Sequence, residues 1–242
     1  MFNMVIVAAL EREVRPLIKH WRRVSRGYEG CTYTFFEHEE TALICGGIGA
    51  QAARRATEAA IAIYHPLVIK SVGFAGALDP SLHVGDLFSP SLILDSRDGS
   101  RTQMEGSDGT LITFMEVAGA AQKSKLAEAY AARAVDMEAA AVAASAMAHG
   151  IACSATKVIS DELDFEIPGM SAFINAKGEF RTAKFVFFIA VRPWVWPRIA
   201  VLARNSAKAA RALAVHLQLG QPGPAALTRS VSSTAAPNGG CN

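Results

Sequence analysis

The chain has 242 residues, 51% of which are hydrophobic, and its formal net charge is +2. This length allows one large α/β domain or two small ones, and the composition can fill a sizeable apolar core. Neither sign of charge dominates and no block of Lys and Arg residues occurs, which argues against nucleic acid as a partner.

The first part of the chain alternates apolar runs with a helical pattern. Residues 3–9 are predicted to form a buried strand of the kind found in parallel sheets. Residues 11–21 follow with the apolar spacing of a helix, so Glu13 lies at a strand-to-helix corner. Acids in a first helical turn are also ordinary partners of the helix dipole. Residues 32–36 and 41–45 are predicted to pair as a hairpin.

Two glycine-containing segments come next. The segment 46–49 has three glycines and precedes an Ala-rich helix predicted at residues 50–64. Residues 67–72 are predicted to be a buried strand that ends at a second glycine-containing segment, the turn 73–78. Glycines at such places let a ligand approach the backbone amides. Neither segment has the spacing of a dinucleotide-binding or phosphate-binding loop, so the signal is weak by itself.

Acidic residues mark two strand ends in the second half of the chain. Residues 134–144 are predicted to pass from the end of a strand into an Ala-rich helix. Asp136 and Glu138 lie where the spacing of apolar residues changes from that of a strand to that of a helix. Asp161 follows another predicted strand. The other expected elements are an apolar run at 87–94, a polar loop at 95–109, strands at 111–117 and 151–159, and helices at 118–130, 181–191 and 194–217.

The alternation of strands and helices predicts a three-layer α/β/α fold with a central mixed, largely parallel sheet. We expect residues 1–219 to form a single domain and residues 220–242, rich in Pro, Gly, Ser and Ala, to be a disordered tail. In an open α/β sheet the ligand crevice lies at the carboxyl ends of the strands. Glu13, Glu138 and Asp161 are therefore expected to converge there.

These strand ends carry motifs in a recognisable order: residues 8–14, 47–50, 73–78 with 84–86, 135–140 and 159–161. In that order they resemble the nucleoside phosphorylase and nucleosidase superfamily, which includes methylthioadenosine/S-adenosylhomocysteine nucleosidase. The resemblance covers most of residues 3–164, and its most specific part is Asp136-Met137-Glu138-Ala139 together with Ser160-Asp161. The short middle of the chain and the segment 192–197 are most similar to the hopanoid-associated phosphorylase branch. Members of that branch are implicated in releasing adenine from adenosylhopane.

The resemblance implies cleavage of the N-glycosidic bond of an adenosine-type nucleoside. Adenine is a poor leaving group as an anion, so Asp161 would protonate the five-membered ring of the purine. Glu13 would position or deprotonate the attacking water, and Glu138 would accept hydrogen bonds from the ribose hydroxyls. Met137 would pack against the sugar. The remaining substrate-binding residues implied are Asp136, Gly73, Phe74, Ala75 and Ser160. No cofactor and no metal are implied.

Two positions depart from the phosphorylases of this superfamily. Phe74 stands where phosphorolytic members commonly have Ser or Thr, and Ser71 stands where hexameric phosphorylases have an arginine. Both differences weaken a phosphate site, because arginine clamps are the usual solution for phosphate. Three other cations are candidates to replace them: Arg12, Arg15 and Lys70. We favour water as the acceptor, with phosphorolysis to a ribose 1-phosphate or the methylthioadenosine/S-adenosylhomocysteine nucleosidase reaction as alternatives.

The cellular setting is predicted from the cysteines and the N-terminus. Cys31, Cys45, Cys153 and Cys241 have no metal or redox spacing, and the apolar N-terminus lacks a basic leader, which predicts a cytoplasmic protein. The resemblance implies a homodimer. The alternative from another class is a nucleoside-binding module without catalysis.

Residues 184–198 are the most aromatic part of the chain, and two interpretations stay open. Apolar runs of this length usually form core-packing helices. Trp194 and Trp196, which lie between prolines and beside Arg192 and Arg198, favour contact with the lipid tail of a nucleoside or with the inner membrane.

Overall fold

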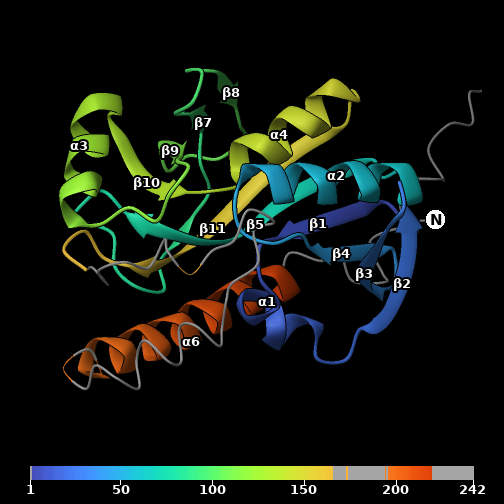
Figure 1. Ribbon diagram of the computed structural model, residues 1–242, viewed down its shortest axis with the longest axis horizontal. Helices are drawn as coiled ribbons and strands as arrows, with labels where there is room; N and C mark the ends of the chain where they lie inside the picture. The colour runs from blue at the N-terminus through green and yellow to red at the C-terminus, as the bar shows by residue number, and fades with distance from the viewer. Residues whose placement is uncertain (1, 166–172, 174–193, 195, 220–242) are drawn as a thin grey trace, which may run out of the picture.

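Among the described residues, eleven strands form one mixed sheet with helices on both of its faces (Figure 1). The computed structural model describes residues 2–165, 173, 194 and 196–219. The helices are α1 (Glu11–Ile18), α2 (Ala50–Tyr64), α3 (Ala120–Tyr130), α4 (Ala139–Ala148) and α6 (Trp196–Leu219). The strands are β1 (Met4–Ala8), β2 (Arg22–Tyr28), β3 (Cys31–His38), β4 (Thr41–Cys45), β5 (Val68–Ala77), β6 (Leu87–Phe88), β7 (Leu92–Asp95), β8 (Arg101–Gln103), β9 (Thr110–Thr113), β10 (Ala132–Asp136) and β11 (Ala152–Asp161). The predicted three-layer α/β fold is confirmed.

The sheet has two parallel regions, one around β1 and β5 and one formed by β10, β9 and β7, and an antiparallel pairing joins them. β1 pairs in parallel with β4 on one side and with β5 on the other, and β5 also pairs in parallel with β11. The predicted hairpin is β3 and β4, which pair antiparallel. β10 runs antiparallel to β5. As a result, the carboxyl ends of β10 and β11 meet the second half of β5, and the carboxyl end of β1 lies beside its middle.

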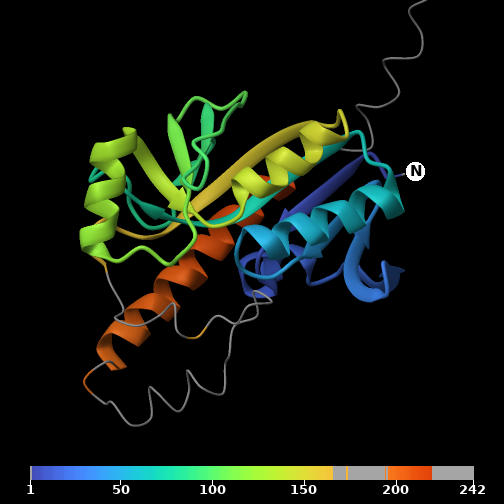
Figure 2. The ribbon, with the colours of Figure 1, turned by 45° about the horizontal axis from the view of Figure 1, so that its top comes forward.

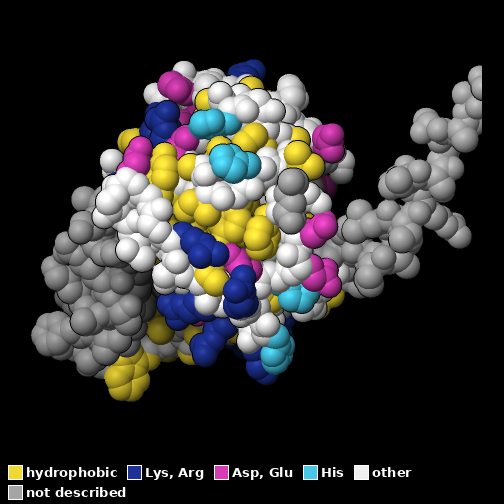
Figure 3. Space-filling view, turned by 90° about the vertical axis from the view of Figure 1, so that its right-hand side faces the viewer, with side chains coloured by type: hydrophobic (Ala, Val, Ile, Leu, Met, Phe, Trp, Pro, Cys, Tyr) yellow, Lys and Arg dark blue, Asp and Glu magenta, His cyan; other side chains and the backbone are white. Residues whose placement is uncertain are grey.

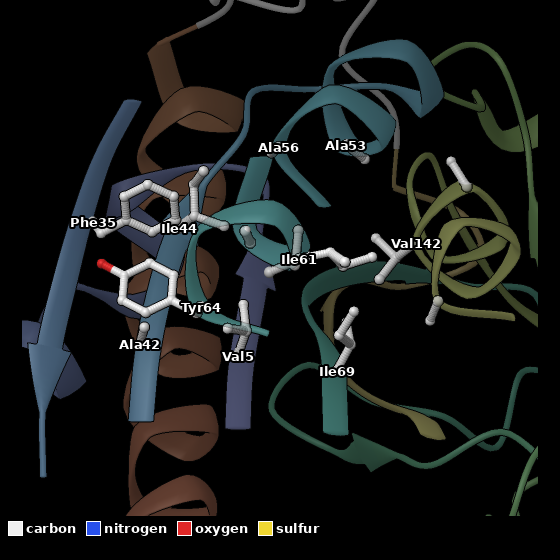
Figure 4. Packing of buried hydrophobic residues seen from close by; sticks show 14 residues of the cluster. Val5, Phe35, Ala42, Ile44, Ala53, Ala56, Ile61, Tyr64, Ile69 and Val142 are labelled. Carbon is white, nitrogen blue, oxygen red and sulfur yellow. The ribbon is translucent and has the colours of Figure 1, made fainter. Parts of the chain in front are cut away.

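β1 divides the core in two, because its side chains alternate between the faces of the sheet. Val5 and Val7 belong to an apolar cluster beneath α2 and α4, in which the rings of Phe35 and Tyr64 lie 4.9 Å apart (Figure 4). Ile6 belongs to the cluster on the other face, which also includes side chains of α1 and α6. Figure 2 shows α2 and α4 on one face of the sheet and α6 on the opposite face.

The sheet has an edge strand, β2, that the sequence did not predict. β2 joins β3 through a tight turn in which Glu29 and Gly30 have positive φ angles of 48° and 73°. Its side chains are mostly exposed, and Arg22 and Arg26 bind the buried carboxylate of Glu37. Such a strand has no apolar alternation to detect, and its charges disfavour pairing with another chain. Lys and Arg side chains gather in the lower part of this end of the molecule (Figure 3).

The predicted end of a strand at residue 72 was wrong, because β5 continues to Ala77. β11 pairs along β5 as far as Gly76, where β10 also pairs with it. Gly73 lies inside this pairing with a φ angle of 142°, a conformation that glycine adopts without steric cost. The glycine that suggested a turn therefore continues the strand.

Other boundaries also differ from the prediction. The apolar run 87–94 divides into β6 and β7, and β8 lies within the predicted loop 95–109. The predicted helix 194–217 corresponds to α6. The predicted helix 181–191 and the predicted tail 220–242 lie outside the described residues. No helix in the described part of the chain is long and apolar enough to cross a membrane.

Candidate active site

A cleft of about 180 Å³ opens where the carboxyl ends of β1, β10 and β11 meet β5. It is lined by nearly all of the predicted site residues: Glu13, Phe74, Ala75, Asp136, Met137, Glu138, Ser160 and Asp161. Gly73 lies outside this lining and contacts Glu13 from beneath. Leu202 and Ser206 of α6 close one side. The geometry therefore brings together residues from at least five separate parts of the chain.

Glu13 is a buried acid in the first turn of α1. Its side chain is 6% exposed, and its Oε2 atom has no hydrogen-bond partner among the described residues. Burial raises the pKa of Glu13 to about 7, although the charges of Lys157 and Arg12 oppose the rise. A carboxyl group with a pKa near neutrality can accept a proton from water during a reaction.

Two glycines of β5 make room for the two acids. A Cβ atom at Gly73 would lie 2.7 Å from Oε2 of Glu13, which is too close for a normal contact. A Cβ atom at Gly76 would lie 2.9 Å from Oδ2 of Asp161 and 3.2 Å from Cε of Lys123. These glycines were predicted to let a ligand approach the backbone, whereas in the structure they accommodate side chains.

Asp136 has a carboxylate that is fully occupied within the protein. Its Oδ1 accepts a hydrogen bond from Oγ1 of Thr113 at 2.7 Å, and its Oδ2 accepts one from the backbone N–H of Ala139 at 2.8 Å. Nζ of Lys157 lies 2.9 Å from the same Oδ2 and donates to Oγ of Ser71 at 3.1 Å. Asp136 thus fixes the start of α4 and holds a buried ammonium group beneath the cleft.

Glu138 is held by backbone amides at the start of two helices. Its Oε1 accepts a hydrogen bond from the N–H of Gly49 at 2.7 Å, and its Oε2 accepts one from Met137 at 3.3 Å. Burial and the nearby charge of Asp136 raise the pKa of Glu138 to about 8, against the opposing charge of Lys157. The glycine segment that precedes α2 therefore binds a protein carboxylate at the cleft.

Asp161 is a partly exposed acid, whereas Glu13 is buried. Its side chain is 24% exposed, at the end of β11. Ser160 donates a hydrogen bond from Oγ to Oδ1 of Asp161 at 2.6 Å, and Nζ of Lys123 lies 2.5 Å from Oδ2. A proton on this carboxyl group would have a direct path to a ligand in the cleft.

Sequence reasoning missed the two lysines of the site. Lys157 could have been identified from the sequence, because a charged residue inside the apolar strand 151–159 needs a buried partner. No sequence pattern identifies Lys123, because a lysine in a helix normally lies at the surface. Leu202 and Ser206 were not predicted either, since nothing in the sequence indicates which face of α6 meets the cleft.

Of the cations considered as phosphate ligands, Arg12 lines the cleft, whereas Arg15 and Lys70 are not among its described lining residues. Ser71 is buried, accepts a hydrogen bond from Lys157 and is not among the described lining residues of the cleft. In the described part of the chain, no group of His, Cys, Asp and Glu residues could hold a metal ion.

The model of the phosphorylase superfamily matches residues 3–118 and 96–185, which together make up most of the chain. The chain belongs to the phosphorylase superfamily. The comparison with curated proteins gave no match.

Solved structures of nucleosidases share the fold of this superfamily member. A Helicobacter pylori methylthioadenosine/S-adenosylhomocysteine nucleosidase mutant with 5′-methylthioadenosine in its active site is 15% identical, with a TM-score of 0.64 over 90% of this chain and 99% of that chain. A Streptococcus pyogenes S-adenosylhomocysteine nucleosidase in complex with 5-methylthiotubericidin is 17% identical, with a TM-score of 0.64 over 91% and 98%. A Colwellia psychrerythraea nucleosidase in complex with adenine is 19% identical, with a TM-score of 0.59 over 67% and 84%.

Proposed function

We propose that this superfamily member hydrolyses the N-glycosidic bond of an adenosine-type nucleoside and releases adenine. The observation that carries the proposal is the convergence of Glu13, Glu138 and Asp161 on one cleft, each in a different environment. Glycosidic bond cleavage needs an acid for the leaving group and a second carboxylate for the water or the developing positive charge. The cleft supplies both, with a further carboxylate for the sugar hydroxyls.

In the proposed reaction the C–N bond breaks while its electron pair moves to the base. The proton of the Asp161 carboxyl group goes to a nitrogen of the five-membered ring, so that adenine leaves as a neutral molecule. The sugar develops positive charge and is attacked by water, whose proton passes to Glu13. Glu138 accepts hydrogen bonds from the ribose hydroxyls, and Met137 and Phe74 form apolar walls of the cleft.

The ligands of the structural neighbours support an adenine nucleoside as the substrate. The Colwellia psychrerythraea protein was determined with adenine, and the Helicobacter pylori mutant with 5′-methylthioadenosine. The methylthioadenosine/S-adenosylhomocysteine nucleosidase reaction is accordingly the main alternative within the same chemistry. Phosphorolysis is the second, and the position of Arg12 in the lining beside Glu13 favours it.

One assay tests the activity and the acceptor. The full chain is incubated with adenosine, 5′-methylthioadenosine and S-adenosylhomocysteine, each with and without phosphate, and free adenine and the sugar product are measured. We expect adenine and free ribose sugar in phosphate-free buffer, with loss of turnover in Glu13→Gln. Strict dependence on phosphate with a sugar 1-phosphate product would establish phosphorolysis. Nucleoside binding without any adenine would identify a binding module.

We further propose that the natural 5′ substituent is a hopanoid lipid, so that adenosylhopane is the substrate. Trp194 and Trp196 support this, because their side chains are 71% and 54% exposed. Leu202 lines the cleft six residues after Trp196, about 9 Å along the same helix. A tail that leaves the cleft along α6 would reach these tryptophans, and the same side chains suit a peripheral membrane contact.

A further inference from the structure

Lys123 is a buried cation that reaches the candidate acid from a helix outside the predicted site. It lies in the first turn of α3, and its side chain is 1% exposed. Nζ lies 2.5 Å from Oδ2 of Asp161, 2.6 Å from the carbonyl oxygen of Glu162 and 3.5 Å from that of Phe165. An ammonium group has three N–H donors, and three oxygens surround this one.

These contacts fix the orientation of the Asp161 carboxyl group. Lys123 occupies Oδ2, and Gly76 leaves the space in which the two side chains meet. Oδ1 accepts a hydrogen bond from Ser160, and Asp161, Ser160 and Lys123 all line the cleft. The carboxyl group therefore cannot rotate without breaking a buried, charge-assisted hydrogen bond.

We propose that Lys123 is a positioning residue for Asp161, holding Oδ2 so that the proton leaves from Oδ1. This inference rests on the proposed function of the cleft. When the C–N bond breaks, its electron pair goes to the base and the proton passes from Oδ1 to a ring nitrogen. The carboxylate that remains is paired with the ammonium group of Lys123, which keeps its own protons.

The energetics favour such a role over a purely structural one. A buried ion pair loses hydration on both partners, and apolar side chains of similar size often stabilise a fold equally well. A preorganised cation beside a group that becomes negatively charged, in contrast, stabilises the transition state directly. A purely structural role would limit Lys123 to fastening the chain after β11, through the carbonyl oxygens of Glu162 and Phe165.

A double-mutant cycle separates the two roles. Lys123→Met, Asp161→Asn and the double variant are compared for kcat and KM of adenine release, after circular dichroism has shown that each is folded. Lys125→Met is the matched control, since Lys125 is exposed on the same helix. If Lys123→Met does not fold, the same cycle is run with Lys123→Gln, which keeps a donor and removes the charge.

We expect Lys123→Met to lower kcat about 100-fold, the usual cost of removing one donor to a developing anion, with little change in KM. The double variant should be no slower than Asp161→Asn, because Lys123 acts through Asp161. Losses that multiply in the double variant, or wild-type kcat in folded Lys123→Met, would overturn this inference alone. A wild-type protein that releases no adenine would contradict the proposed function as well.

Discussion

Glu13 and Asp161 carry the same functional group in two different environments. Glu13 is buried, its Oε2 atom has no hydrogen-bond partner in the described part of the chain, and burial raises its pKa to about 7. Asp161 is partly exposed and touches both a hydroxyl and an ammonium group. The two carboxyl groups therefore differ both in burial and in the groups that they contact.

Replacing Asp161 tests the assignment of the acid. Asp161→Asn keeps the shape of the side chain but removes the proton, so we expect kcat for adenine release to fall by about 10²–10⁴. Lys123 keeps the carbonyl oxygens of Glu162 and Phe165 as acceptors, so the fold should persist. Steady-state kinetics and thermal unfolding measure both effects. Wild-type turnover by the folded variant would show that another group protonates the base.

The environment of Glu13 also predicts how stability depends on pH. Because its pKa is about 7 in the folded protein and 4.5 ordinarily, the unfolded chain releases this proton first as pH rises. The contribution of Glu13 to the free energy of unfolding therefore falls between about pH 4.5 and pH 7, by about 3 kcal/mol, and is constant above that window. Glu13→Gln should abolish this dependence.

Urea unfolding of wild type and Glu13→Gln at about pH 5 and about pH 8 measures this effect. The variant should gain stability relative to wild type at the higher pH. Glu11→Gln on the same helix is the control, because Glu11 is exposed and its substitution should cause no such change. A difference between wild type and Glu13→Gln that is the same at both pH values would contradict the buried-acid description.

The three acids could be placed from sequence because each follows a strand in the chain. At Glu13 and Glu138 the spacing of apolar residues changes from that of a strand to that of a helix. The carboxyl ends of strands meet at a common edge of the sheet, so acids at these ends are expected to lie together. Lys123 could not be placed in this way, because its contact with Asp161 joins residues that are 38 positions apart. The packing of α3 against β10 helps to bring them together.

At the level of elements, β5 shows where prediction from local residue preferences gives the wrong end of a strand. Gly73 and Gly76 were predicted to lie in a turn after an apolar strand, yet both lie within the strand. Each position excludes a Cβ atom because a functional side chain fills the space in front of it. That reason lies in other segments of the chain, so local propensity cannot reveal it. β2 was missed for a different reason, since its exposed, Arg-rich sequence lacks an apolar face.

Gly73→Ala tests this account of β5. A Cβ atom would collide with Oε2 of Glu13, and residues other than glycine rarely adopt a φ angle of 142°. We expect a loss of about 1–3 kcal/mol in the free energy of unfolding, and lower turnover because Glu13 must move. Gly27→Ala on β2 is the control, because nothing lies within 4 Å of its Cβ position. Equal stability of the two variants would refute the steric explanation.

At the scale of the whole molecule, α6 brings the C-terminal part of the described chain against the N-terminal helix α1 and beside the cleft. It packs against α1 and β11, and Leu202 and Ser206 complete the cleft lining. The three-layer fold followed from the order of strands and helices, but the path of this last helix did not. Its apolar residues could have met either face of the sheet, and the long-range contacts with α1 decide between them.

The exposed tryptophans at the start of α6 lead to a prediction about the substrate. Residues 184–193 and 195 of the aromatic segment lie outside the described residues, so the test concerns Trp194 and Trp196. If they receive a lipid tail or a bilayer, changing both to Ser should weaken liposome binding at least about tenfold, because burying one aromatic side chain contributes about 1.5–3 kcal/mol. Turnover of a lipid-linked nucleoside should fall in parallel.

Cleavage of a small soluble adenosine analogue should survive in the same double variant, because neither tryptophan lines the cleft. Met147→Ser provides the control for loss of an exposed apolar side chain, since Met147 is 59% exposed on α4, across the sheet from α6. Sedimentation with anionic liposomes and parallel assays of the two substrates measure the outcome. Equal loss of both activities in a folded variant would mean that these tryptophans support the fold, and unchanged lipid-nucleoside turnover would remove them from substrate recognition.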